Sequence, residues 1–314
     1  MTADLTDPIF NNEDAARAHF ESLRWPTGRI CPHCGVVDQS TELKGKTTRP
    51  GLYKCNACRK PFTATMGTVY EKSHIPLHKW LLATHLLCAS KKGMSAHQLW
   101  RMLGFGSYRT AWFMAHRIRE AMRDGDFEPP MGSDGGAVEV DETFIGNLKG
   151  VKKPRGGAGH KMKVISLVER NTGRAKSIVV DDLSLDTVIP ILDANMSREA
   201  HLMTDEAPRY GTIGWNFRAH GVVNHAKEEY VSFTNPDVHT NTIEGFFSVF
   251  KRGMRGVYQH CGEQHLHRYM AEFDFRYSNR AKLGVTDKER AAKAVEGAVG
   301  KRLTYRQPDQ QQAA

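Results

Sequence analysis

The sequence predicts an α/β protein in which two smaller modules precede a mixed sheet flanked by helices. Three observations support this class: two C-x-x-C pairs early in the chain, helical periodicity over 76–122, and strand-like alternation from Val138 that later gives way to alternating helices and strands. The 314 residues suffice for two or three domains. We expect the domains at 11–66, 67–125 and 137–285, followed by a polar tail over 286–314.

The bulk composition indicates a globular protein with an anionic partner. Hydrophobic residues make up 40% and charged residues 25% of the chain, which excludes a disordered protein. The net charge of +9 favours a polyanionic partner, although charge alone is weak evidence. No apolar run approaches the roughly 18 residues of a membrane span. Residues 1–10 also lack the apolar core of a signal peptide, so we expect a cytoplasmic protein.

The first module is built around four cysteines. Cys31 and Cys34 form one C-x-x-C pair, and Cys55 and Cys58 form a second about 20 residues later. Two such pairs can complete a tetrahedral site of four sulfurs, which suits a structural zinc ion because no open position remains. A redox role is disfavoured, since no thioredoxin-like strand and helix surround either pair. A leading amphipathic helix is expected within 11–25, and whether this ribbon contacts a partner or braces the next module stays open.

The second module is expected to hold three helices. Ser95 and Ser107 are good N-caps for the second and third helices, and Gly104 lies in the turn between them. A glycine turn before a basic third helix is typical of a helix-turn-helix, whose last helix enters the major groove of DNA. The alternative is a helical linker with a solvated basic face. Trp112, Ala115, Ile118 and Met122 are predicted on the inner face of the third helix, and the predicted DNA contacts are Arg109, Arg117 and Arg119.

The third module begins with a strand centred on Asp141. Residues alternate along this strand, so that Glu139 and Asp141 share one face while Glu142 lies on the other. Asp205 is expected at the end of a later strand, with a helix behind it. Strands are predicted at 138–146, 163–169, 175–180, 201–206 and 222–225.

A long amphipathic helix is predicted over 240–257. Its apolar residues recur at helical spacing and can pack on the sheet. A separate polar stripe contains Asn241, Glu244 and Lys251, and the last two lie about two turns apart. On an isolated helix such an acidic and basic pair is better interpreted as a solvated surface.

Three carboxylates are the candidate catalytic groups, namely Asp141, Asp205 and Glu244. Ionised carboxylates brought together repel one another unless a cation is present. An all-oxygen ligand set suits Mg²⁺ or Mn²⁺, and two such ions can activate a nucleophile and stabilise a leaving oxygen in phosphodiester chemistry. By spacing alone this triad is one option among several, and the rival carboxylates, interpreted as loop residues, are Asp181, Asp182 and Asp186.

At these positions the sequence resembles the ISXO-like insertion-sequence transposases. The resemblance runs in order from about residue 15 to about residue 280. It rests on Cys31-Pro32-His33-Cys34-Gly35, Tyr53-Lys54-Cys55-Asn56-Ala57-Cys58, Val138-Glu139-Val140-Asp141-Glu142-Thr143, Thr204-Asp205, and His239-Thr240-Asn241-Thr242-Ile243-Glu244 with Lys251.

The resemblance implies a ribonuclease-H-like fold, a two-metal Asp-Asp-Glu site and DNA strand transfer. It also implies that Lys251 contacts DNA near the scissile phosphate. Some family members are thought to use an asparagine at the position of Asn241 as the third ligand. We favour Glu244, because a carboxylate binds Mg²⁺ better than a neutral amide does.

The working hypothesis is a transposase that binds terminal inverted repeats, hydrolyses a phosphodiester at each end and transfers the 3′-hydroxyl to target DNA. It would work as a homodimer or larger assembly on paired ends, in the nucleoid of a bacterial cell. The alternatives are a ribonuclease-H-like nuclease or resolvase without strand transfer, and a zinc-ribbon DNA-binding regulator. Phosphate contacts are predicted for Lys149, Lys152, Lys153, Arg155, Arg252 and Arg255.

Overall fold

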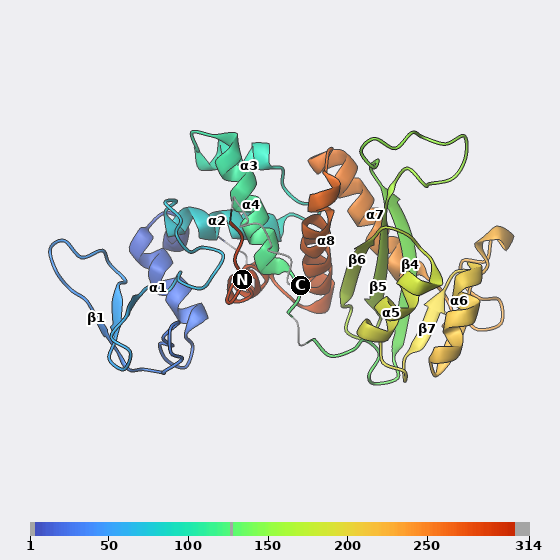
Figure 1. Cartoon of the computed structure of the whole chain (residues 1–314), viewed down its shortest axis with the longest axis horizontal. Helices are drawn as coiled ribbons and strands as arrows, with labels where there is room; N and C mark the ends of the chain where they lie inside the picture. Colours follow the sequence, from blue (N-terminus) through green and yellow to red (C-terminus); the bar gives the residue numbers. More distant parts are fainter. Residues whose placement is uncertain (1–3, 126–127, 305–314) are drawn as a thin grey trace, which may run out of the picture. The chain divides into compact units, whose positions relative to one another are not determined.

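The computed structural model describes residues 4–125 and 128–304, and these divide into two compact units (Figure 1). Residues 4–90, 94–123 and 285–304 form the first, which we call the ribbon unit. Residues 91–93 and the described part of 124–284 form the second, which we call the sheet unit. Across the described residues, no helix combines the length and the apolar character needed to cross a membrane.

The ribbon unit begins with the predicted leading helix, α1 (Glu13–Arg24), which follows the short η1 (Pro8–Phe10). The Asn12 side chain caps α1 by accepting the N–H groups of Asp14 and Ala15. The three short strands β1 (Ser40–Glu42), β2 (Tyr53–Cys55) and β3 (Pro61–Phe62) then form an antiparallel sheet in that order. The rings of Trp25, Tyr53 and Phe62 pack together with centroids 5.8–6.0 Å apart, which gives the small sheet an aromatic core.

Three helices follow as predicted: α2 (Leu77–Ala89), α3 (Ala96–Leu103) and α4 (Tyr108–Met122). Ser95 accepts the N–H of Gln98, and Ser107 accepts the N–H of Arg109, so both predicted N-caps are confirmed. Gly104 ends α3 with φ of 63°, in the left-handed region where glycine is favoured. Helix α2 is buried on most sides, and its Cys88 is a core residue.

The predicted exposure of the basic α4 residues is wrong for two of the three arginines. Arg119 is 1% exposed, and Arg117 is buried with its guanidinium donating to the carbonyl of Glu71 at 2.7 Å. The Arg117 guanidinium also lies 5.1 Å from the centroid of the Trp80 ring. Only Arg109 is exposed. Neighbouring segments cover most of α4. Tertiary packing therefore buries Arg117 and Arg119, which the helical periodicity had assigned to the exposed face.

The prediction of a polar tail from residue 286 is wrong over α9 (Asp287–Glu296). A capping box joins Thr286 and Glu289 at the start of this helix. Its Ala294 and Val295 are buried, and Arg290 donates to the carbonyl of Cys88 on α2 at 3.0 Å. The helix completes the ribbon unit because α2 offers it an apolar face. The part of the predicted tail at 305–314 lies outside the described residues.

The sheet unit contains five strands in the order β6-β5-β4-β7-β8. The first three along the chain form an antiparallel meander, and β7 and β8 continue the sheet in parallel with β4. This confirms the predicted mixed α/β class with ribonuclease-H-like topology. The strands are β4 (Ala137–Ile145), β5 (Met162–Glu169), β6 (Ala175–Val180), β7 (His201–Thr204) and β8 (Ala219–Val222). The last strand was predicted at 222–225 and ends at Val222, because Asn224 leaves the ladder to cap the short η3 (His225–Lys227).

Helices cover both faces of this sheet (Figure 1). On one face, Val138 and Val140 of β4 pack with residues of α5 (Leu185–Asn195) and α6 (Pro208–Ile213), which continues into η2 (Gly214–Asn216). On the other face, Ile145 packs with residues of α7 (Asn241–Gly253) and α8 (Glu263–Ser278). Helix α7 runs into a π-helical turn, η4 (Met254–Tyr258), and α8 is followed by η5 (Ala281–Leu283). The predicted division of β4 into two faces is therefore confirmed.

Candidate active site

The four cysteines of the ribbon converge on one point. The Sγ atoms of Cys31 and Cys58 lie 3.8 Å apart, and those of Cys34 and Cys55 lie 3.7 Å apart. All four ligand atoms fall within 4.8 Å of one another, and no other such group of three or more ligands occurs among the residues that the structure describes. The backbone N–H of Cys58 also donates to the Cys55 sulfur at 3.4 Å. Four sulfurs leave no open position, so this zinc-binding cluster serves structure.

The pairing of β4 with β7 places Asp141 and Asp205 near each other. The parallel ladder between β4 and β7 pairs Glu139 with Met203. Two residues further along come Asp141, still on β4, and Asp205, the first residue after β7. Side-chain alternation places Asp141 on the same face of β4 as Glu139, which accepts a hydrogen bond from α7. Asp205 lies just after β7, where its carboxylate accepts the N–H of Ala207 at 3.0 Å and the chain turns toward α6.

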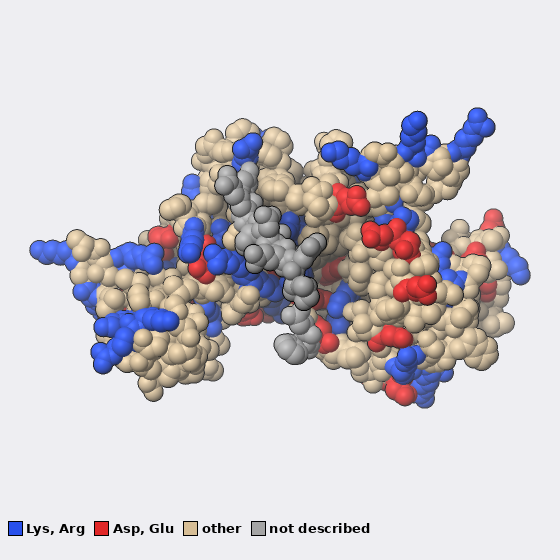
Figure 2. Space-filling view, viewed as in Figure 1, with Lys and Arg blue, Asp and Glu red and all other residues tan. Residues whose placement is uncertain are grey.

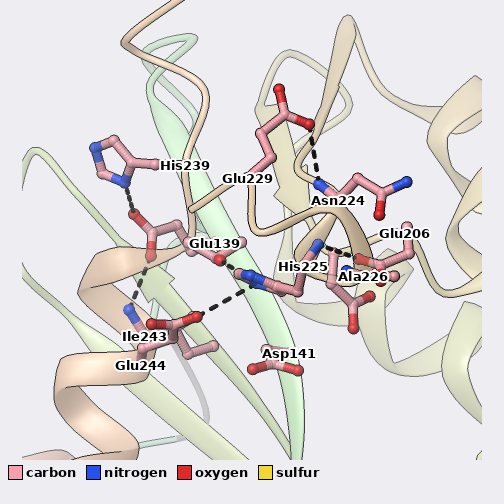
Figure 3. A network of polar contacts seen from close by, with 12 residues as sticks. Glu139, Asp141, Glu206, Asn224, His225, Ala226, Glu229, His239, Ile243 and Glu244 are labelled. Carbon is pink, nitrogen blue, oxygen red and sulfur yellow. Dashed lines mark hydrogen bonds and ion pairs between the residues drawn. The ribbon is translucent and has the colours of Figure 1, made fainter. Parts of the chain in front are cut away.

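Glu244 comes from the first turn of α7 and faces the same region (Figure 3). Its Oε1 lies 3.3 Å from Nε2 of His225. The close-up places Asp141 on its strand next to these two side chains (Figure 3). The three predicted carboxylates therefore lie in one region, where the charges of Asp205 and Glu244 act on Asp141, although they are not gathered as closely as the four cysteine sulfurs are.

The surroundings of Asp141 raise the pKa of its carboxyl group. Burial first, and then the negative charges of Asp205, Glu142 and Glu244, together raise the pKa of Asp141 to about 7. The N–H of Glu142, which donates to Oδ1 of Asp141 at 2.6 Å, acts in the opposite direction. A bound cation would favour the ionised form of Asp141. The all-oxygen donor set fits Mg²⁺ or Mn²⁺ and does not fit a thiophilic metal.

Lys251 and Asn241 flank Glu244 on the same helix. Lys251 lies seven residues beyond Glu244, roughly 10 Å along the axis, with its Nζ 5.7 Å from the centroid of the Phe247 ring. Asn241 is the first residue of α7 and is exposed.

The remaining predicted phosphate contacts are all exposed. Arg252 and Arg255 lie near the end of α7 and in the π-helical turn that follows it. The long loop between β4 and β5 carries the other four, and Figure 2 shows Lys and Arg side chains projecting from this part of the sheet unit. These loop residues are Lys149, Lys152, Lys153 and Arg155.

Asp181 and Asp182 are loop residues, as predicted, whereas Asp186 lies in the first turn of α5, so the loop prediction is wrong for it. Asp181, Asp182 and Asp186 are all exposed. Oδ1 of Asp182 accepts three hydrogen bonds: from the N–H of Ser184 at 2.9 Å, from the hydroxyl of Ser184 at 2.6 Å and from the hydroxyl of Thr187 at 2.8 Å. The hydroxyl and N–H of Ser184 lower the pKa of Asp182 to about 2. The hydrogen bonds of this carboxylate are therefore made with residues at the start of α5.

Sequence reasoning missed the polar residues that hold the carboxylates in place (Figure 3). Glu206 accepts the N–H groups of His225 and Ala226 at 2.9 and 3.1 Å, which fixes the segment that carries the His225 ring beside Glu244. Glu139 is 0% exposed and accepts hydrogen bonds from Arg170 and from the backbone of α7. The only sequence signal for Glu139 was its position on the same strand face as Asp141.

Comparisons with known proteins agree with the resemblance seen in the sequence. Residues 134–278 match the ISXO2-like transposase domain, and residues 11–61 match the transposase zinc-ribbon domain. The first match contains the three carboxylates, and the second contains the four cysteines. A curated relative, the uncharacterized protein in transposable element ISH50 of Halobacterium salinarum, is 28% identical over 287 residues. The aligned part covers 85% of this chain and 91% of the relative.

Proposed function

The chain belongs to the ISXO2-like transposases, and from this premise we propose that it is a metal-dependent enzyme that cuts and joins DNA at the ends of an insertion sequence. One observation carries the proposal beyond family membership. Asp141 lies on β4, Asp205 directly follows the neighbouring parallel strand β7, and Glu244 lies in the first turn of α7, and the charges of Asp205 and Glu244 both act on Asp141. Such an arrangement of carboxylates is costly in a folded protein unless a cation binds there.

In this proposal Asp141, Asp205 and Glu244 bind two Mg²⁺ or Mn²⁺ ions. When bound, the ions would activate a water or a 3′-hydroxyl and stabilise the leaving oxygen of the phosphodiester. Asp141, whose pKa lies near 7 without a metal, would bind the ion as a carboxylate and release its proton to solvent. Glu244 is preferred to Asn241 as the third ligand because its charge acts on Asp141 and its carboxylate binds the ion more strongly.

The basic side chains of the sheet unit are proposed to hold the DNA backbone. Lys251 and Arg255 follow Glu244 along one helix and its π-helical extension, so they can neutralise phosphates on one side of the scissile bond. The exposed lysines of the β4–β5 loop extend the same cationic surface. In the ribbon unit, the exposed Arg109 is proposed as a DNA contact. Arg117 and Arg119 are buried and are not proposed as DNA contacts.

The partner in this proposal is double-stranded DNA, both at the element ends and at the target. Joining two ends requires at least two active sites, so a homodimer or larger assembly on the nucleoid is proposed. The zinc ribbon and the three following helices lie within one compact unit. We propose that this unit recognises the inverted repeats as a whole.

A strand-transfer assay tests the proposal. Pre-cleaved duplexes that carry the element ends with free 3′-hydroxyls are incubated with the protein, Mn²⁺ and a supercoiled plasmid. We expect joined products that require both the metal and Glu244, with Glu244→Gln inactive. In a parallel reaction with uncut duplexes, cleavage at the ends without joined products in either reaction would instead identify a nuclease or resolvase. Specific binding to the ends with neither reaction would identify a regulator.

A further inference from the structure

Two glutamates flank Asp141 on β4, and both are used by neighbouring helices. We propose that Glu139 and Glu142 are positioning residues: Glu139 fixes α7, and Glu142 fixes α6, so that Glu244 and Asp205 are held opposite Asp141. This inference rests on the proposed function. It assigns to the two glutamates a role distinct from binding the metal.

Glu139 connects β4 directly to the start of α7 (Figure 3). Its Oε2 accepts the backbone N–H of Ile243 at 2.8 Å. Ile243 lies in the first turn of α7, where N–H groups have no partner within the helix, and it immediately precedes Glu244. A carboxylate at a helix N-terminus is also favoured by the helix dipole. The backbone position of Glu244 is thereby fixed relative to the strand of Asp141.

Arg170 completes this connection. Its Nε donates to Oε1 of Glu139 at 2.5 Å, and its two terminal nitrogens donate to the carbonyls of Asp237 and His239 at 2.5 and 2.6 Å. The guanidinium therefore fastens the segment that leads into α7. It also neutralises Glu139, whose two oxygens are both engaged by the protein. A buried carboxylate already paired in this way has little to gain from a metal ion.

Glu142 acts on the opposite face of β4. Its Oε1 accepts the hydroxyl of Tyr210 at 2.7 Å and pairs with the guanidinium of Arg209. Both partners lie on α6, whose preceding turn is held by Asp205 through the N–H of Ala207. Alternation places Glu139 and Glu142 on opposite faces of β4. The same strand therefore contacts α7, which carries Glu244, on one face and α6, which follows Asp205, on the other.

The positioning role predicts a specific defect in metal binding. Replacing Glu139 with glutamine keeps a carbonyl that can accept the Ile243 N–H but removes the charge that pairs with Arg170. Glu142→Gln likewise keeps an acceptor for Tyr210 and loses the pair with Arg209. Changes in outer partners of metal ligands weaken metal affinity by about 10- to 100-fold without removing the ligands. The site should therefore remain and bind metal more weakly.

The experiment measures Mn²⁺ binding to the zinc-loaded full chain by electron paramagnetic resonance, together with the Mn²⁺ concentration that half-saturates end cleavage. Glu169→Gln is the matched control. Glu169 is a buried glutamate on β5 that accepts the N–H of Gly132 at 2.5 Å and the hydroxyl of Thr172, and both of these partners lie outside α6 and α7. We expect Glu139→Gln and Glu142→Gln to bind Mn²⁺ about 10-fold or more weakly, with cleavage restored by excess metal and with Glu169→Gln unchanged.

Two results would overturn the inference. Wild-type affinity in both variants would show that neither glutamate positions the site, and complete loss of binding that excess Mn²⁺ does not restore would make them ligands. Should Glu139→Gln fail to fold, the double variant Glu139→Gln/Arg170→Met removes both charges, leaves no unpaired buried ion and is judged by the same criteria. If the wild-type protein binds no Mn²⁺ in the sheet unit, the proposed function itself fails, which is a different outcome.

Discussion

Replacing Asp141 by asparagine should stabilise the protein in the absence of Mg²⁺ and Mn²⁺, although it should abolish catalysis. Burial raises the pKa of Asp141 to about 7, against 3.8 for an ordinary aspartate. A raised pKa in the folded state means that the neutral form is favoured in the fold. The stability that this contributes is present below pH 4 and is lost as the pH rises through 7. Asparagine stays neutral and does not incur this loss.

The magnitude follows from the difference between the two pKa values. Over a range of pH, Asp141 is ionised in the unfolded chain but protonated in the folded protein. Within this range, the free energy of unfolding falls by about 1.4 kcal/mol for each pH unit. Between pH 5 and pH 7 this amounts to at most about 3 kcal/mol, after which the effect is complete. For a unit of this size, about 3 kcal/mol corresponds to roughly 5–10 °C in the melting temperature.

Differential scanning calorimetry of the zinc-loaded protein, in buffer freed of other divalent ions, measures this effect. The melting temperature of Asp141→Asn should exceed that of the wild type at pH 8 by several degrees more than at pH 5. Asp186→Asn, which changes an exposed carboxylate, should show no such pH dependence. Free Mn²⁺ at about 100 times its Kd should add about 2.7 kcal/mol to the wild type and nothing to Asp141→Asn.

An advantage of Asp141→Asn that is equal at pH 5 and pH 8 would refute this reasoning. The same holds for a variant less stable than the wild type at pH 8. Either result would mean that ionisation of Asp141 does not lower the stability of the metal-free protein. The surroundings of Asp141 would then not be those described.

Three further predictions concern the zinc cluster and the basic residues. Cys55→Ser removes one of four zinc ligands and should release zinc and unfold the ribbon, as measured by a colorimetric zinc assay and circular dichroism; retained zinc would contradict the four-sulfur site. Arg117→Ala should lower the stability of the ribbon unit by about 1–3 kcal/mol, because it removes a buried hydrogen bond to the Glu71 carbonyl and a ring contact, whereas Arg109→Ala should leave stability unchanged and weaken DNA binding. Replacing Lys152 and Lys153 together by alanine should reduce the slope of log K against log salt by about 2, if each neutralises one phosphate; an unchanged slope in a filter-binding titration would remove the β4–β5 loop from the DNA surface.

Local patterns sufficed for the parts of the molecule that are determined locally. The spacing of Cys31, Cys34, Cys55 and Cys58 defines a zinc ribbon because each pair must turn onto one ion. The caps at Ser95 and Ser107 could be predicted because an N-cap bonds to N–H groups two or three residues away.

Tertiary contacts decided what the sequence could not. Periodicity assigns residues of α4 to faces but does not reveal which faces other helices cover, so the buried Arg117 and Arg119 were misassigned. Helix α9 was missed because it is stabilised by packing against α2, which is distant in the sequence. Of the partners of Glu139, Arg170 is 31 residues away and Ile243 is 104 residues away, and no local pattern connects such positions.

The central claim is tested most directly by cleavage of a labelled duplex that carries the inverted repeats flanking the gene. Wild type, Asp205→Ala and the exposed-carboxylate control Asp186→Ala are compared with and without Mg²⁺. The account predicts metal-dependent nicking at the end of the repeat by the wild type and by Asp186→Ala. It predicts none by Asp205→Ala, which should still bind the DNA. Equal nicking by Asp205→Ala, or nicking that needs no metal, would contradict a catalytic site formed by Asp141, Asp205 and Glu244.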